Sequence, residues 1–185
     1  MVPTGIKKVA RKSVASVRQK KKASLPEVEV WVEGPEKLAV GQINEISVGI
    51  EGKERVAING VDLVLLYDSS RIKIIDQDSQ KAGVQVQPVQ ATLGKMARDL
   101  VDADKGRVIV SLLNLNESGV TLDKGERKTL AKIKIVPRST GKVNFRLKLA
   151  DAGQPGTKVS KAGVNQGLAV LVKSDYQATI LGSEK

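Results

Sequence analysis

The side chains with the spacing best suited to catalysis are two pairs of carboxylates, Asp76 with Asp78 and Asp102 with Asp104. Carboxylates that lie close together can divide the roles of acid and base between them. Aspartate is also common in turns, where its side chain accepts hydrogen bonds from the backbone. Neither pair is accompanied by a complementary base or a glycine-lined pocket in the sequence. We therefore predict that these residues stabilise turns and that the chain is not an enzyme.

The same acidic segments begin like calcium-binding loops, but neither completes the pattern. In the segment that starts at Asp76, Lys81 occupies the position of the glycine that the tight turn requires. No bidentate glutamate follows at the end of either loop. The chain also contains no cysteine and no histidine, which excludes disulfides, thiol nucleophiles, Cys/His zinc sites and Ser-His-Asp triads. We expect no metal and no cofactor.

Aromatic side chains, which stack on sugars in many glycan-binding proteins, are scarce. Trp31, Tyr67, Phe145 and Tyr176 are the only ones. In the alternation along their strands, Tyr67, Phe145 and Tyr176 fall on the side that faces the core. Trp31 falls on the polar side of its strand. Trp31 could be an exposed platform, or a loop or the N-terminal arm could cover it. A planar aromatic strip for cellulose is not expected.

Basic residues are concentrated at the N-terminus. Of the 31 Lys and Arg residues, eight lie in residues 1–25, which hold no acid, so the rest of the chain has 31 − 8 = 23 cations against 20 acids. This arm is predicted to be flexible or weakly helical. It could bind an anionic polymer or an acidic membrane surface, or be a solvated tail. It lacks interleaved aromatic residues, so specific nucleic-acid recognition is not expected. Its cations are Lys7, Lys8, Arg11, Lys12, Arg18, Lys20, Lys21 and Lys22.

From Pro26 onward, apolar and polar residues alternate with the period of a β-strand. Valine and isoleucine dominate, and turn signals recur at the spacing of an all-β sandwich. One domain over residues 26–182 is predicted, with residues 183–185 as a tail. Residues 91–101 are ambiguous between helix and strand, and residues 151–167 form a long loop. The expected strands are 28–33, 45–50, 61–67, 72–75, 84–89, 107–113, 131–135, 143–149, 168–172 and 176–180.

Two of these strands, 131–135 and 143–149, could form a hairpin. That pairing would place Lys134 opposite Arg146 and Lys132 opposite Lys148, and like charges in such positions repel each other. The charge pattern therefore favours a connection that crosses from one sheet to the other.

Several of these segments resemble the cohesin-type domain, a β-sandwich related to carbohydrate-binding modules. The resemblance rests on residues 59–75, which include Tyr67-Asp68-Ser69 in place of the family's Tyr-Asp-Pro, and on residues 106–111, 130–135 and 140–145. It implies a nine-stranded jelly-roll sandwich and a strand near residues 96–101. It also implies work outside the cell or at its surface.

In the cohesin family a partner binds the sheet that holds the third, fifth, sixth and eighth strands. The resemblance therefore implies a protein-docking face, with a dockerin-like module as partner, unless an inserted loop such as residues 151–167 hides it. Self-assembly with other copies by strand addition is an alternative, as is attachment to a glycan or polyanion. The outward residues implied for the docking face are Asp62, Val64, Leu66, Asn144, Arg146 and Lys148.

Overall fold

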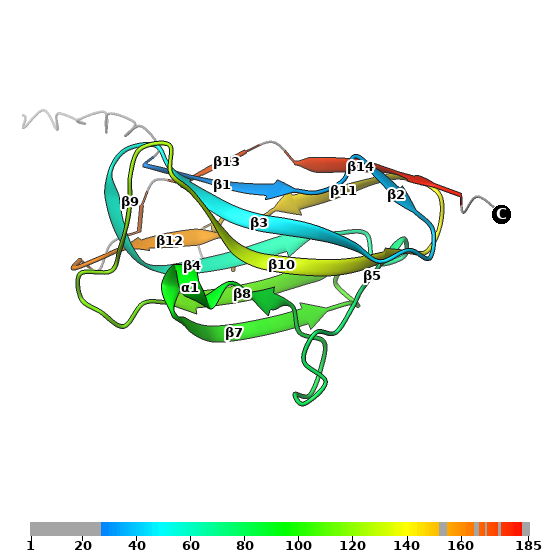
Figure 1. The fold of residues 1–185 in the computed structure, drawn as a ribbon, viewed down its shortest axis with the longest axis horizontal. Helices are drawn as coiled ribbons and strands as arrows, with labels where there is room; N and C mark the ends of the chain where they lie inside the picture. Colours follow the sequence, from blue (N-terminus) through cyan, green and yellow to red (C-terminus); the bar gives the residue numbers. More distant parts are fainter. Residues whose placement is uncertain (1–26, 152–154, 165–166, 169, 174, 183–185) are drawn as a thin grey trace, which may run out of the picture.

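A computed structural model describes residues 27–151, 155–164, 167–168, 170–173 and 175–182. The basic arm, the tail and the predictions made for them lie outside these residues. Two twisted β-sheets pack face to face (Figure 1), and the described part contains one short helix, α1 (Gln90–Leu93). No helix in this part has the length and the apolar character needed to cross a membrane.

The first sheet, sheet I, is built around the long strands β3 and β10. Its order is β13 (Val170–Val172), β1 (Val28–Glu33), β3 (Asn44–Gly52), β10 (Arg127–Pro137) and β5 (Ile72–Ile74), with β6 (Gln87–Pro88) also paired to β10.

The second sheet, sheet II, is built around β4. Its order is β2 (Lys37–Ala39), β14 (Tyr176–Leu181), β11 (Gly141–Leu147), β4 (Val56–Leu66), β8 (Arg107–Leu113) and β7 (Lys95–Asp102). Two further strands pair with β4, namely β9 (Val120–Leu122) and β12 (Lys158–Lys161).

The described residues form fourteen strand segments, more than the nine strands that the resemblance implied. β5 and β6 both pair with β10, and β11 and β12 both pair with β4. β13 pairs with β1 in sheet I, and the chain then crosses to pair β14 with β11 in sheet II. The predicted all-β jelly-roll sandwich is confirmed, whereas the number of strand segments differs from the predicted nine.

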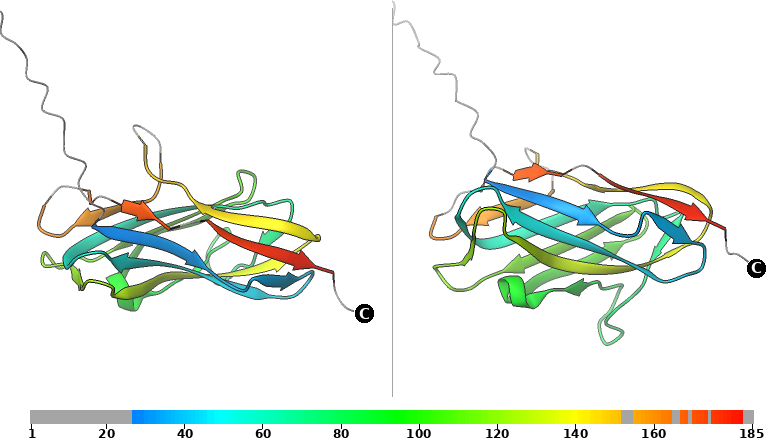
Figure 2. Two further views of the ribbon diagram at one scale, coloured as in Figure 1. Left: turned by 90° about the horizontal axis from the view of Figure 1, so that it is seen from above. Right: turned by 45° about the horizontal axis from the view of Figure 1, so that its top comes forward.

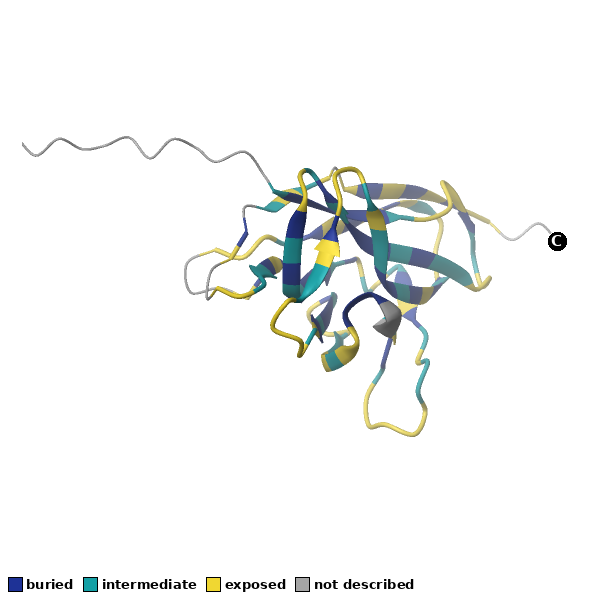
Figure 3. Cartoon of the chain, turned by 60° about the vertical axis from the view of Figure 1, so that its left-hand side comes forward, coloured by how far each residue is buried: buried dark blue, intermediate teal, exposed yellow. Residues whose placement is uncertain are grey.

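The core lies between the sheets and consists mainly of valine, isoleucine and leucine. Alternating side chains of each strand point inward, so buried and exposed bands alternate along the strands (Figure 3). Two aromatic residues meet at one end, where the rings of Phe145 and Tyr176 stack with centroids 5.6 Å apart. Burial of Tyr176 raises the pKa of its phenol to about 12.

The ambiguous segment 91–101 is mostly strand. α1 ends at Leu93, and β7 follows, as the resemblance implied. A β-bulge between Met96 and Arg98 shifts the alternation of side chains along β7. The weak strand expected over residues 84–89 is reduced to the two residues of β6.

β10 and β11 lie in different sheets, so the predicted crossover is correct and the like charges do not face each other. Lys134 instead pairs with Glu45 of β3 in the strand register, and the ammonium of Lys132 lies 2.9 Å from the same glutamate's carboxylate.

Candidate functional site

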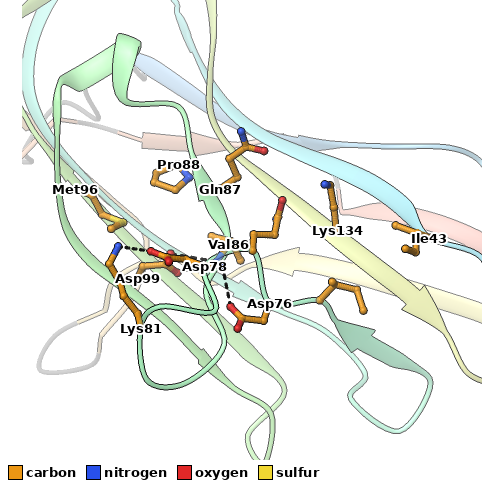
Figure 4. Close-up of a pocket in the computed structure, with 12 residues that line it drawn as sticks. Ile43, Asp76, Asp78, Lys81, Val86, Gln87, Pro88, Met96, Asp99 and Lys134 are labelled. Carbon is orange, nitrogen blue, oxygen red and sulfur yellow. Dashed lines mark hydrogen bonds and ion pairs between the residues drawn. The ribbon is translucent and has the colours of Figure 1, made fainter.

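One hollow of the described surface contains one of the predicted carboxylate pairs, and its residues are drawn in Figure 4. Asp76 accepts hydrogen bonds from the backbone N–H groups of Asp78 and Gln85, at 3.1 and 3.0 Å. The Asp78 carboxylate lies 2.7 Å from the Lys81 ammonium. Both carboxylates therefore stabilise the loop between β5 and β6, as predicted.

A third carboxylate in this hollow, Asp99, accepts the N–H of Val86 with both oxygens, at 3.1 and 3.2 Å. Burial raises its pKa above the ordinary value. Asp102 of the other pair accepts the N–H of Lys105 and forms an ion pair with Arg107 at 2.9 Å. No three acidic side chains of the described residues gather closely enough to hold a metal ion.

Trp31 is not an exposed platform for sugars. Its side chain lies on the outer face of sheet I but is only 5% exposed. The Arg127 guanidinium covers the ring at 4.2 Å from the ring centroid, in a cation–π contact. On the neighbouring strand, Gly49 leaves room for the ring, because a Cβ there would lie 2.0 Å from the Trp31 Cζ2 atom. A residue of β10 therefore covers Trp31 on this face.

Charges on this outer face of sheet I largely neutralise one another. Arg127 lies 2.7 Å from the Glu33 carboxylate, and Lys53 lies 2.7 Å from Glu29 and 2.8 Å from Glu51. The hydrogen bond from Arg127 lowers the pKa of Glu33, and the hydrogen bond from Lys53 lowers that of Glu51. This face offers few free charges to a partner.

The outer face of sheet II brings the predicted docking residues together. β11 and β4 are neighbours in which Arg146 pairs with Leu66. The N–H of Lys148 donates to the carbonyl of Val64 at 2.9 Å. Toward the margins, Asn144 donates to Asp175 at 3.2 Å, and Asp62 forms an ion pair with Lys158 at 3.1 Å. The six residues predicted for the docking face thus lie on β4, on the adjacent β11 or directly after it: Asp62, Val64, Leu66, Asn144, Arg146 and Lys148.

An insertion interrupts the strand that runs beside β4. β11 pairs with β4 up to Leu147, and pairing resumes at Lys158, which is opposite Asp62. The described residues of the chain between them, 149–151 and 155–156, lie outside the named strands and rise from the body of the sandwich (Figure 2). Thr157 closes the gap that remains. Its hydroxyl accepts the N–H of Val64 at 3.1 Å, and its own N–H donates to the carbonyl of Lys148 at 2.6 Å.

The insertion determines which of the predicted apolar residues remain accessible. Val64 is only 4% exposed, whereas Leu66, beyond the insertion, is half-buried. Val64 therefore cannot be an open contact residue, and this corrects the prediction for it. The sequence left open whether an inserted loop hides the docking face. The structure shows Val64 hidden and Leu66 partly accessible.

Three hollows follow one another along β4 on this face. The cationic hollow, of about 350 Å³, lies on the Leu66 side of the insertion. The middle hollow, of about 230 Å³, lies between the insertion and the outward side chains of β8, Ile109 and Ser111. The apolar hollow, of about 460 Å³, lies over Gly60 at the other end. It is lined by three exposed apolar residues, Leu113, Leu115 and Val164.

Sequence reasoning missed part of this face. Lys105 and Arg107 line the cationic hollow together with Arg146 and Lys148, but the sequence assigned Lys105 only to a turn and Arg107 only to a buried strand. The segment 151–167 was treated as one loop, yet it contains β12. The alternation of Lys158, Val159 and Ser160 was the signal that could have revealed this strand.

Comparison with known proteins supports the fold through structure rather than sequence. No family model and no curated protein matches the sequence of this chain. Solved structures do match across most of the chain, and they are cohesin modules. The chain has the cohesin fold.

Three of these cohesin structures illustrate the match. A type I cohesin of ScaB from Pseudobacteroides cellulosolvens is 14% identical with a TM-score of 0.60, covering 85% of this chain and 94% of that one. A cohesin in a type I cohesin–dockerin complex from Clostridium thermocellum is 14% identical with a TM-score of 0.61, covering 88% and 99%. A type II cohesin of the ScaA scaffoldin from Acetivibrio cellulolyticus is 12% identical with a TM-score of 0.61, covering 83% and 97%. At these low identities the match shows a shared fold and does not identify the binding residues of this chain.

Proposed function

We propose that this chain is a non-catalytic module that docks a protein partner on the outer face of sheet II. This docking face consists of the outward sides of β11, β12, β4, β8 and β7. The observation that carries the proposal is the contrast between the two outer faces. On sheet I, most cations pair with carboxylates around a covered tryptophan. On the docking face, Arg146 and Lys148 form no ion pair with a described carboxylate and line a hollow that also contains Leu66.

Such a surface is typical of protein interfaces. Binding energy in an interface concentrates at a few apolar or arginine side chains seated in hollows, with polar groups around them. The docking face supplies Leu66 and Arg146 at one end and exposed leucines at the other. The cohesins that share the fold include modules solved in complex with dockerins. We extend that mode of binding to this chain, with a dockerin-like module as its partner in an extracellular or cell-surface assembly.

Site-specific photo-crosslinking in the cells that make this protein tests the proposal. The crosslinking residue is placed at Arg98 or Asn144, which are exposed on two margins of the docking face, and at Lys73, which is exposed on sheet I. We expect Arg98 and Asn144 to yield the same protein adduct and Lys73 to yield none. An adduct at Lys73 alone would contradict the proposed docking face, and so would the absence of an adduct at all three positions.

A further inference from the structure

The cationic hollow has an excess of positive charge that the described residues do not neutralise. Its lining contains four cations and no carboxylate: Lys105, Arg107, Arg146 and Lys148, with Val64, Leu66 and Pro155 as the apolar part. One carboxylate, Asp102, lies beside two of these cations, 2.9 Å from Arg107 and 3.7 Å from Lys105. Among the described residues, no carboxylate lies within ion-pair distance of Arg146 or Lys148, and those two charges are free to meet a ligand.

The contact with Asp102 fixes part of the hollow in place. The Arg107 Nε donates a hydrogen bond to the Asp102 carboxylate at 3.1 Å, and the Arg107 Nη2 lies 2.9 Å from the same oxygen in an ion pair. Desolvation acts to raise the pKa of Asp102, but the hydrogen bonds from Lys105 and Arg107 and the charges of both outweigh it, so the pKa is lowered. Asp102 therefore stays ionised and holds Arg107 against the hollow. Positioned cations of this kind bind a carboxylate without first having to be ordered.

The floor of the hollow indicates which kind of anion fits. Leu66 is half-buried between Arg146 and Arg107, its paired residues on the two neighbouring strands. Pro155 of the insertion forms another wall, and the space is about 350 Å³. A sulfated or phosphorylated polymer has no aliphatic side chain that could fill such a hollow. A peptide segment with an apolar side chain beside carboxylates would fill it and pair with its rim.

We propose that the cationic hollow binds an acidic segment of the protein partner, in which glutamate or aspartate side chains flank an apolar residue. The proposal rests on the docking face proposed above and specifies the chemistry that this face selects. The apolar residue packs on Leu66, and the carboxylates meet Arg146 and Lys148. Because Arg146 is exposed and Lys148 is only partly buried, the pairing governs the choice of partner and the salt dependence of binding.

The test uses the full-length ¹⁵N-labelled chain and amide chemical shifts, which separate the hollow from the cationic arm. The probe is a short capped peptide in which leucine is flanked by glutamates. Its counterpart replaces each glutamate with glutamine, and a sulfated oligosaccharide of equal charge is the third probe. We expect the acidic peptide to shift the amides of Leu66, Arg107, Arg146 and Lys148. The glutamine peptide should bind about tenfold more weakly, since two exposed charge pairs are lost.

Charge reversal provides the matched variants. Arg146→Glu with Lys148→Glu should abolish the shifts at Leu66, whereas Lys73→Glu with Lys134→Glu, an equal change of charge on sheet I, should leave them unchanged. The dispersion of the remaining amide signals reports that each variant is folded.

Three results would overturn the proposal. They are equal binding of the glutamine peptide, equal binding of the sulfated oligosaccharide at the same amides, and acidic-peptide shifts absent from the hollow. The crosslinked partner then separates the two proposals. If it is trapped on the docking face but binds both charge-reversal variants equally, the acidic segment is wrong and the docking face stands. If it is trapped elsewhere, the docking face itself is wrong.

Discussion

Replacing Thr157 with valine tests how the insertion is fixed to the docking face. Thr157 is 1% exposed, and its hydroxyl is the acceptor for the N–H of Val64. Valine has a similar shape but no acceptor, so this buried N–H would lose its partner. An unsatisfied buried donor costs about 1–3 kcal/mol. In a domain of this size each kcal/mol lowers the Tm by about 2–4 °C.

The assay for Thr157→Val combines urea unfolding, followed by the fluorescence of the single tryptophan, with hydrogen exchange at the Val64 amide. We expect lower stability together with faster exchange at Val64. Thr157→Ser removes a buried methyl group and also lowers stability, but it keeps the hydroxyl and should preserve protection at Val64. Thr179→Val, on an exposed position of β14, is the control for a threonine without this role. A Thr157→Val variant within about 0.5 kcal/mol of the wild type, with Val64 still protected, would refute the reasoning.

Three further predictions address the rest of the fold. Gly49→Ala should destabilise the protein by about 1–3 kcal/mol, because a Cβ at this position would lie 2.0 Å from the Trp31 ring. The displaced ring should shift its fluorescence emission toward that of an exposed indole. Unchanged emission would contradict this prediction. Tyr176, with a pKa of about 12, should show no tyrosinate absorbance in the folded protein near pH 10. Its folded pKa exceeds the unfolded value of about 10, so stability should fall as pH rises between these values, and less so in Tyr176→Phe. Asp99→Asn should be more stable than the wild type at neutral pH, because burial raises the Asp99 pKa and so disfavours the ionised carboxylate. This gain in stability should shrink as the pH falls and Asp99 becomes protonated. A gain that grows as the pH falls would contradict the prediction.

Most of the fold could be predicted because apolar residues alternate with polar or charged residues along strands such as β10 and β11. The separation of β10 and β11 into different sheets could also be predicted, because pairing them would have placed Lys134 opposite Arg146. Local rules sufficed in these places, since the strand period and the charge pairs depend only on nearby residues.

The features that the sequence did not reveal depend on contacts between distant residues. The cover over Trp31 comes from Arg127, ninety-six positions later in the chain (127 − 31 = 96), and requires a glycine on the strand between them. Val64 is buried because, after the insertion, Thr157 lies beside β4 again and its hydroxyl accepts the N–H of Val64. Lys105 joins the cationic hollow only because a turn brings it beside Arg146. Strand periodicity assigns a residue to one side of a sheet but does not say what covers that side.

The affinity of the crosslinked partner for two matched variants tests the docking face most directly. Leu66→Asp places a carboxylate in the proposed contact, and Leu171→Asp makes the same change at a residue of sheet I that is 44% exposed. The proposed docking face predicts that Leu66→Asp weakens binding about tenfold or more while Leu171→Asp leaves the Kd unchanged. A folded Leu66→Asp variant that binds the partner as tightly as the wild type would contradict it.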